Sequence, residues 1–166
     1  MDTVSAPNNG LVITTARVVP AWLDYNEHMN VAYYLVAFET GIDAYKAIVG
    51  LTPAYIAAHR RSTVALEAHI TYQREAALND DLRIETRVID CDGKRAHIYQ
   101  EMYRAGELLS TQETLALSFD IAARRSAPFE PAIAAGYAAL IAAQQALPRP
   151  AWVGRSIAIK QGRPQS

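Results

Sequence analysis

A change in hydrophobic period limits the folds open to this chain more than any other feature of its sequence. From Asn30 onward, apolar side chains recur about every 3.6 residues, the period of an amphipathic helix. These positions are Val31, Tyr34, Leu35, Phe38, Ile42, Tyr45, Ile48 and Val49. Asn30 is a favourable N-cap, and Gly50 stands where a helix would stop. The pattern predicts one long helix over roughly 31–49, and Gly41 within it predicts close packing against a neighbouring element.

Strand patterns lie on both sides of this helix. Residues 11–19 are rich in β-branched types and end at Pro20, which suits a first strand. After a short helical turn over 52–61, turn residues separate four expected strands: 63–76, 82–90, 94–104 and 108–120. Hairpin-length links predict a mainly antiparallel meander, and the long strands indicate strong curvature. We therefore expect an α+β fold, in which a curved antiparallel sheet of five or more strands wraps around the long helix and buries both of its faces.

The two ends of the chain differ from this central part. Residues 131–146 predict an alanine-rich second helix, whose small side chains suit close docking on the sheet or on a partner subunit. Residues 1–10 are expected to form an N-terminal tail and residues 11–146 a single domain. Residues 147–166 form a basic tail without acidic residues, which leaves 12 basic against 17 acidic residues in the rest of the chain. This tail is predicted to be disordered, with an edge strand over 156–160 as the alternative.

Composition excludes several classes of protein. The chain has 166 residues, of which 51% are apolar, and its charge is balanced, with 16 Lys and Arg against 17 Asp and Glu. This balance argues against an intrinsically disordered chain and against a general nucleic-acid binder. The single cysteine, Cys91, excludes an intramolecular disulfide and a cysteine-based zinc site. No apolar run approaches the roughly 20 residues that span a bilayer, and MDTVSAPNNG lacks the features of a signal peptide, so we expect no membrane association and a cytoplasmic location.

The densest group of reactive side chains is DYNEHMN, residues 24–30, between the first strand and the long helix. Backbone N–H groups in the first turn of a helix lack intrahelical partners and can hold an anion or a developing oxyanion. An ionised Asp24 beside such donors can act as nucleophile, or as base for water, in acyl-group hydrolysis. Asn30, at the start of the helix, is a further catalytic candidate. A simpler interpretation is that Asp24 and Asn30 only cap turns. His28 is a candidate to orient Asp24 or to contact substrate, and an exposed loop histidine is its alternative.

The motif D-x-x-x-H-M-N-x-A-x-Y, which begins at Asp24, opens the long helix and is followed by the four strands. Over roughly residues 11–125 this order resembles the hotdog-fold acyl-CoA thioesterases of the 4-hydroxybenzoyl-CoA type. The resemblance implies that Asp24 is the catalytic carboxylate and that a main-chain N–H at Val31, or at its immediate neighbours, polarises the thioester carbonyl. It also implies no cofactor, because coenzyme A is part of the substrate. The family usually has glycine where this chain has Glu27, and we expect glutamate there to restrict positive φ.

A narrower resemblance rests on three stretches, WLDYNEHMNVAYYLVAF from Trp22, LEAHITYQRE from Leu66 and RRSAPF from Arg124. Together they are similar to the betainyl-CoA thioesterases of carnitine breakdown. The betainyl group carries a quaternary ammonium, which aromatic faces bind by cation–π attraction. The candidates for substrate binding near Asp24 are Trp22, Tyr25, Asn26, Tyr33 and Tyr34, with core or surface packing as the alternative for each ring. Adjacent helical residues cannot face the same way, so we expect at most one of Tyr33 and Tyr34 to line a pocket.

The strand expected over 63–76 supplies further candidates. Glu67 and His69 should share one face of it and Tyr72 should take the other, unless a bulge intervenes. Glu67 is a candidate to face a ligand cation or to orient His69, and a solvated face or an interface ion pair is the alternative. Tyr72 is a candidate for substrate binding. No metal site is predicted, because neither HExxH nor a comparable ligand spacing is present.

Coenzyme A carries phosphate groups, so basic side chains should line a route to the site. The basic tail is one candidate. The others, each with a solvated surface charge as its alternative, are Arg60, Arg61, Arg74, Lys94, Arg95, Arg124 and Arg125. A single copy of the sheet leaves an exposed edge, which predicts a homodimer or a dimer of dimers, and the resemblance implies sites at the dimer interface. The alternatives to a betainyl-CoA hydrolase are a thioesterase for another small or aromatic acyl-CoA and a non-catalytic protein that binds CoA esters.

Overall fold

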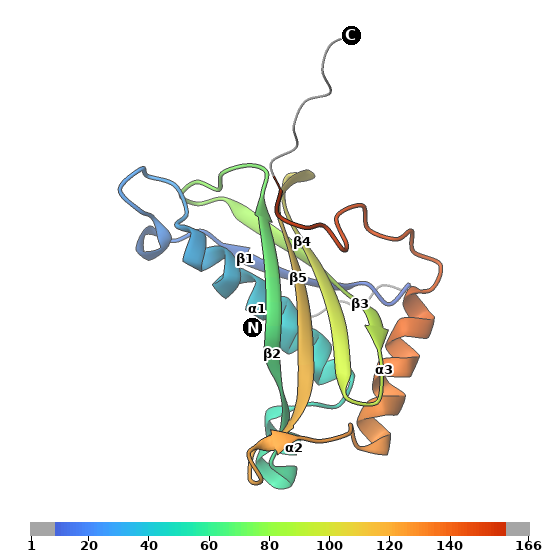
Figure 1. Ribbon diagram of the computed structural model, residues 1–166. Helices are drawn as coiled ribbons and strands as arrows, with labels where there is room; N and C mark the ends of the chain where they lie inside the picture. Colours follow the sequence, from blue (N-terminus) through green and yellow to red (C-terminus); the bar gives the residue numbers. More distant parts are fainter. Residues whose placement is uncertain (1–8, 159–166) are drawn as a thin grey trace.

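A curved antiparallel sheet carries the long helix α1 on its inner face in the computed structural model, which describes residues 9–158 (Figure 1). The strands are β1 (Val12–Arg17), β2 (Arg61–Tyr72), β3 (Asp81–Cys91), β4 (Arg95–Arg104), β5 (Glu107–Asp120) and the short β6 (Arg125–Ser126). The helices are α1 (Val31–Ile48), α2 (Pro53–His59) and α3 (Pro131–Gln144), and a 3-10 turn, η1, covers Pro20–Trp22. The predicted α+β class, long helix and additional C-terminal helix are confirmed. Within the described residues, no helix combines the length and the apolar character needed to cross a membrane.

The strand order in the sheet is β1-β3-β4-β5-β2, and β6 pairs with the end of β5. Only β3, β4 and β5 follow one another as a meander, so the predicted meander of four consecutive strands is wrong for β2. Residues 73–80 instead cross from β2 at one edge to β3 near the other. A turn does form within them, in which Asp80 N donates to the Ala77 carbonyl (3.1 Å). A local turn does not decide which strands pair, because pairing also depends on how each strand packs against α1.

The middle of α1 lies very close to the sheet at Gly41. A Cβ atom there would overlap Thr86 Oγ1 and come within 2.6 Å of Gln100 Nε2. Gln100 is fully buried, and its Nε2 donates to the Phe38 carbonyl (2.9 Å) and to Thr86 Oγ1 (3.0 Å). These bonds join the helix to β3 and β4 and satisfy polar groups whose burial would otherwise be costly. The close packing predicted at Gly41 is confirmed.

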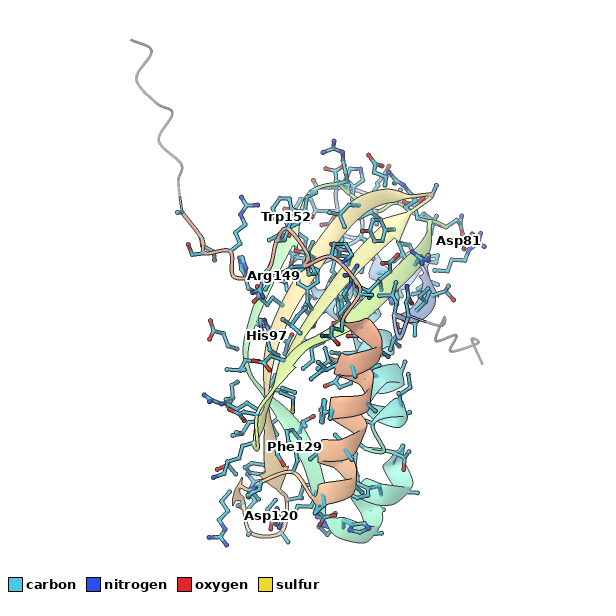
Figure 2. The ribbon with its side chains drawn as sticks, turned by 90° about the vertical axis from the view of Figure 1, so that its right-hand side faces the viewer. Asp81, His97, Asp120, Phe129, Arg149 and Trp152 are labelled. Carbon is cyan, nitrogen blue, oxygen red and sulfur yellow. The ribbon has the colours of Figure 1, made fainter. Side chains whose placement is uncertain are left out.

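The alanine-rich helix α3 lies beside α1 and over the end of β3 (Figures 1 and 2). Gly136 permits this approach, since a Cβ atom there would lie 2.5 Å from the Val49 carbonyl oxygen. At the end of α3, Gln144 Oε1 accepts from Val88 N (2.9 Å), and Gln144 Nε2 donates to the Gly10 carbonyl (2.8 Å). The pairing of β1 with β3 begins only at Thr86. The Gln144 amide therefore satisfies the edge of β3 that β1 does not reach.

After α3, residues up to 158 run along the outer face of the sheet, opposite α1 (Figure 2). Arg87 Nη1 donates to the Pro148 carbonyl (2.9 Å). The Gly154 amide donates to a carboxylate oxygen of Glu113 (2.8 Å). These contacts give the segment a defined path across the sheet.

The prediction of a disordered tail is therefore not confirmed for residues 147–158. The first part of the alternative edge strand, residues 156–158, is not in a strand. Residues 159–166 lie outside the described part of the chain, so the rest of that prediction is not tested.

One side of α1 and the edge strand β2 are exposed in the single chain. The exposed large apolar side chains include Val31, Leu35, Val36 and Ile48 on α1 and Val64 and Leu66 on β2. The expectation that the sheet buries both faces of α1 is therefore wrong within one chain. A register shift between Ala65 and Glu67 makes Leu66 a bulge residue on β2, which pairs only with β5 in the described structure.

Replacing Gly41 by alanine should lower the free energy of unfolding by about 1 to 3 kcal/mol, because the added methyl group overlaps Thr86 and Gln100. Urea denaturation followed by circular dichroism measures this loss. The matched control is Gly93→Ala between β3 and β4, where a Cβ atom meets nothing within 4 Å. That control should change the unfolding free energy by less than about 0.5 kcal/mol. Unchanged stability of the Gly41 variant would contradict the packing described.

Candidate functional site

The loop between η1 and α1 is a hairpin with three residues at its tip. Asp24 N donates to the His28 carbonyl (3.0 Å), Glu27 N donates to the Asp24 carbonyl (3.0 Å), and a bridge pairs Leu23 with Met29. The last residue of such a loop takes the left-handed conformation that glycine favours. Glu27 adopts it with a φ of 65°, at a cost of about 1 to 2 kcal/mol. Glutamate therefore makes this conformation costly, as expected, but does not prevent it, and the hairpin forms without glycine.

The carboxylate of Asp24 begins this hairpin and is half-buried. Its Oδ1 accepts from Asn26 N (2.8 Å), as in an Asx turn. Its Oδ2 accepts no hydrogen bond from residues 9–158. Asn30 Oδ1 accepts from Ala32 N (3.0 Å) and caps α1. The capping roles of Asp24 and Asn30 are thus confirmed, and they leave one oxygen of Asp24 available for chemistry.

The first turn of α1 presents an unpartnered backbone amide at Val31. The next two amides are occupied, since Ala32 N donates to the Asn30 side chain and Tyr33 N donates to the Asn30 carbonyl (2.9 Å). No group in the described part of the chain accepts a hydrogen bond from Val31 N. This N–H lies at the positive end of the helix dipole, where a developing oxyanion is stabilised. Val31 is therefore the amide best placed to donate to a substrate.

Asp24 and Val31 line one groove of about 370 Å³, between the hairpin, the start of α1 and the residues after β2. The groove brings together six of the predicted site residues: Asp24, Asn26, His28, Val31, Tyr34 and Tyr72. Its two walls are joined through Ala76, whose carbonyl accepts from Met29 N (2.8 Å) and whose N–H donates to the Tyr34 hydroxyl (3.0 Å). The fold thus assembles this groove from two segments that are far apart in the sequence.

Four of the candidates for substrate binding lie outside this groove in the single chain. Trp22 stacks on Tyr33, with ring centres 5.7 Å apart. Tyr25 is 95% exposed at the tip of the hairpin. Glu67 lies on the outer face of the sheet with His69, whereas Tyr72 lies on the inner face, as strand alternation predicts. The sheet therefore separates Glu67 from the groove within one chain.

Tyr34 and Tyr72 give the groove an aromatic wall. Their rings are 5.1 Å apart in an edge-to-face arrangement. Tyr34 is buried, whereas the ring of Tyr72 is half exposed. Burial raises the pKa of both hydroxyls above the ordinary value of 10.0, so both are neutral at physiological pH. Of Tyr33 and Tyr34, only Tyr34 lines the groove, as the helix geometry predicted.

The segment after β2 supplies groove residues that the sequence reasoning did not assign to a place beside Asp24. They are Gln73, Arg74 and Glu75. Glu75 Oε2 lies 3.1 Å from His28 Nε2, and Arg74 Nε lies 3.2 Å from a carboxylate oxygen of Glu107. Arg74 was among the basic candidates for the phosphates of CoA. The stretch LEAHITYQRE contains all three residues, so the resemblance marked them, but only the fold placed them at this groove.

Arg104, the last residue of β4, holds the segment after β2 in place through two ion pairs. Its guanidinium lies 2.7 Å from Asp80 Oδ2 and 2.9 Å from Glu107 Oε2. Burial by itself would raise the pKa of Asp80, but hydrogen bonds from Ala77 N and Arg104, together with the Arg104 charge, lower it below the ordinary 3.8. Asp80 is therefore ionised at neutral pH and holds the turn that closes the segment.

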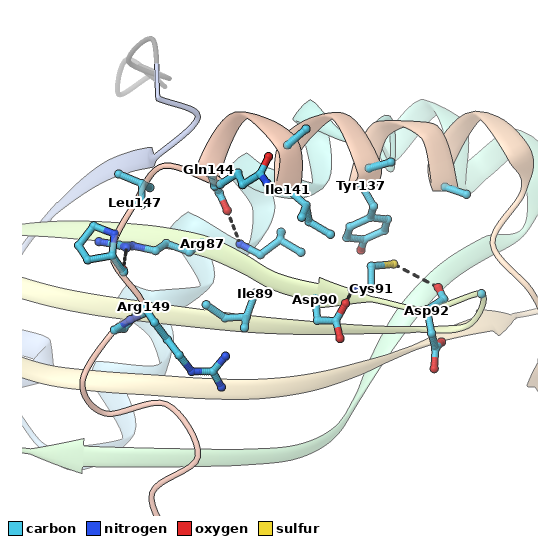
Figure 3. A pocket seen from close by; sticks show the side chains of 18 residues that line it. Arg87, Ile89, Asp90, Cys91, Asp92, Tyr137, Ile141, Gln144, Leu147 and Arg149 are labelled. Atoms are coloured by element: carbon cyan, nitrogen blue, oxygen red, sulfur yellow. Dashed lines mark hydrogen bonds between the residues drawn. The ribbon is translucent and has the colours of Figure 1, made fainter.

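Two hollows much larger than this groove lie away from Asp24. One, of about 810 Å³, lies between the end of β3, α3 and the chain after α3, with Tyr137 and Cys91 on its walls (Figure 3). The other, of about 700 Å³, lies on the outer face of the sheet and contains Glu67 and His69. Neither is lined by a carboxylate together with an unpartnered helix amide. We therefore place the candidate site in the smaller groove.

Residues 18–137 match the thioesterase-like superfamily. The chain is 36% identical over 152 residues to a betainyl-CoA thioesterase of Pseudomonas aeruginosa, which covers 89% of this chain and 96% of that protein. It is 35% identical over 147 residues to an L-carnitine dehydrogenase/betainyl-CoA thioesterase of Ruegeria pomeroyi, covering 88% of this chain and 30% of that longer protein. Among solved structures, a hypothetical protein of Staphylococcus aureus in complex with CoA matches with a TM-score of 0.85 and 27% identity, over 90% of this chain and 96% of that one. A DHNA-CoA thioesterase of Staphylococcus aureus, 17% identical, matches in fold with a TM-score of 0.74 over 80% of this chain and 92% of that one.

Proposed function

Because the chain belongs to the thioesterase-like superfamily and is an acyl-CoA thioesterase with the predicted hotdog fold, we propose that it hydrolyses betainyl-CoA to betaine and free CoA. The observation that carries the chemistry is the convergence of Asp24 and the unpartnered Val31 amide on one groove. The names of the similar proteins and the aromatic lining of the groove support the betainyl group as the acyl part of the substrate. We place the reaction in carnitine breakdown, because several relatives combine this thioesterase with an L-carnitine dehydrogenase.

In the proposed reaction, the thioester carbonyl lies between Asp24 and Val31. The Val31 N–H donates to the carbonyl oxygen and stabilises the negative charge of the tetrahedral intermediate. Asp24 then acts in one of two ways. As nucleophile, its carboxylate adds to the carbonyl carbon, the CoA thiolate leaves, and water hydrolyses the resulting anhydride. As base, it takes a proton from water, hydroxide adds to the carbonyl, and the departing thiolate receives that proton.

Neighbouring groups support this role of Asp24. The Asn26 N–H holds Oδ1 and leaves Oδ2 available, and the Asn30 cap keeps Val31 at the start of the helix. We assign His28 to substrate contact rather than to orienting Asp24, because its ring nitrogen lies beside Glu75. Substrate contact stays a prediction for the candidates that do not line the groove in one chain, which are Trp22, Tyr25, Tyr33 and Glu67.

We further propose that the reaction needs no cofactor, since a carboxylate and a helix amide suffice for this chemistry. A cytoplasmic location is also proposed, because Cys91 is a free thiol and thiols stay reduced in that compartment.

A homodimer, or a dimer of such dimers, is proposed as the assembled form. Strand β2 ends the sheet, and Leu66 on it is 53% exposed. The adjoining side of α1 exposes Leu35 and Val36. Pairing of β2 with the same strand of a second copy would continue the sheet and cover these side chains. The groove would then lie near the partner, because Tyr72 is the last residue of β2.

Replacing Asp24 by asparagine should lower kcat for thioester hydrolysis by at least about 100-fold, because the nucleophile or base is lost. Folding should be retained, since the amide oxygen of asparagine can still accept from Asn26 N. Release of free thiol from a small panel of acyl-CoA esters measures the activity. The matched control is Asp43→Asn, which removes the same charge from an exposed position on α1. Full activity of the Asp24 variant would overturn the assignment.

The unmodified protein should prefer betainyl-CoA to 3,3-dimethylbutanoyl-CoA, in which carbon replaces the charged nitrogen without a change of shape. We expect KM to be about 10-fold lower for the charged substrate, the order of effect that a cation bound against aromatic rings and carboxylates produces. Thiol release with both esters measures this ratio. Equal values of KM would exclude recognition of the charge.

Replacing Leu66 by lysine should convert the dimer to a monomer, because two added charges would face each other across the paired β2 edges. Light scattering during size-exclusion chromatography gives the mass. Ile157→Lys, which places a lysine at another exposed apolar residue on the chain after α3, is the control and should leave the mass unchanged. A monomeric unmodified protein, or a Leu66 variant with unchanged mass, would refute this interface.

A further inference from the structure

Glu75 brings a second carboxylate into the groove that contains Asp24. Its Oε2 lies 3.1 Å from His28 Nε2, and its side chain is 73% exposed. The backbone beside it is fixed, because the N–H of Ala76 donates to the buried Tyr34 hydroxyl (3.0 Å). The Glu75 carboxylate is therefore held next to the hairpin and remains accessible to a ligand.

Arg74, which lines the groove, and Arg104 beside it are both engaged with a different carboxylate. Arg74 Nε lies 3.2 Å from Glu107, and Arg104 Nη2 lies 2.9 Å from the same side chain. In the described structure, Asp24 and Glu75 are the two carboxylates that line the groove, and neither forms an ion pair with an arginine or a lysine. The groove therefore presents negative charge that is suited to a cationic ligand.

The cation of a betainyl group must bind close to the reacting carbonyl. One methylene separates the two, so the nitrogen lies about 2.5 Å from the carbonyl carbon, as in the N–Cα–C unit of an amino acid. A trimethylammonium group has no N–H, so charge and aromatic faces recognise it rather than hydrogen bonds. Glu67 lies on the opposite face of the sheet from this carbonyl position. Glu75 and the half-exposed ring of Tyr72 share the groove with Asp24 and are within reach.

We propose that Glu75, together with the ring of Tyr72, selects the cationic acyl group of the substrate. This inference rests on the proposed betainyl-CoA activity. Glu75 supplies the charge that attracts the ammonium, so Asp24 is left to act on the carbonyl. The ammonium charge does not change during hydrolysis, so Glu75 stabilises the bound substrate and the transition state alike. Its effect is therefore mainly on KM.

The Glu75→Gln variant, assayed with betainyl-CoA and with neutral 3,3-dimethylbutanoyl-CoA, tests the proposal. We expect kcat/KM for betainyl-CoA to fall about 10-fold, or about 1.4 kcal/mol, mainly through a higher KM. For the neutral ester we expect a change of less than about 2-fold, because it makes no charge interaction with Glu75. Glutamine keeps the size of the side chain, and thermal unfolding followed by circular dichroism verifies that the fold is intact.

Two further variants separate this proposal from its rivals. Asp43→Asn removes the same charge from an exposed position on α1, about 18 Å along the helix from Val31, and should leave the ratio of the two substrates unchanged. Glu67→Gln tests the carboxylate on the outer face, and loss of the preference there but not at Glu75 would overturn the proposal.

The outcomes also separate this proposal from the proposed function. If the unmodified protein prefers betainyl-CoA and the Glu75 variant keeps that preference, or loses both activities equally, the role of Glu75 is wrong and the substrate assignment stands. If the unmodified protein shows no preference for the charged ester, the substrate assignment and the role of Glu75 both fail. Thiol release from the neutral ester would then still demonstrate thioesterase activity.

Discussion

The close packing of α1 against the curved sheet is the constraint on which the rest of the structure depends. Gly41 lets the helix backbone rest on Thr86 and Gln100, where a side chain would collide, and Gln100 ties the helix to the strands beneath it. A helix advances about 1.5 Å per residue as a stiff rod. Fixing its middle therefore also fixes Val31 at its start. The proposed oxyanion donor is thus positioned by core packing together with the Asn30 cap.

The groove also depends on main-chain hydrogen bonds between the hairpin and the segment after β2. Met29 N donates to the Ala76 carbonyl, and an isolated bridge pairs His28 with Ala77. These bonds involve the backbone, so they hold the frame of the groove independently of the side chains at Asp24 and Glu75. In the proposed function, the groove combines a centre for hydrolysis with a neighbouring wall that sets acyl specificity. Substitutions in this wall would then change which acyl group binds without altering the hydrolysis itself.

The exposed side of α1 links the site to the proposed assembly. A helix that carries Leu35 and Val36 towards solvent has an apolar face that the single sheet does not cover. The neighbouring edge strand β2 leads directly to Tyr72 and the groove. A second copy placed along this edge would therefore cover the helix and approach the site at once. In the proposed dimer, this one surface would therefore bury the apolar side chains of α1 and also bring the partner close to the groove.

The sequence by itself determined where the long helix and most strands lie, and it predicted the candidate site around Asp24. The helical period, the Asn30 cap and the reactive loop around Asp24 all depend on residues close together in the chain, so local chemistry was enough to predict them. It could not determine that β2 pairs with β5, that Tyr25 points away from the groove, or that Glu75 rather than Glu67 stands beside Asp24. These features depend on which strands pair and on which face of the sheet each side chain takes. Such long-range choices minimise exposed apolar surface over the whole fold, and only the tertiary structure records them.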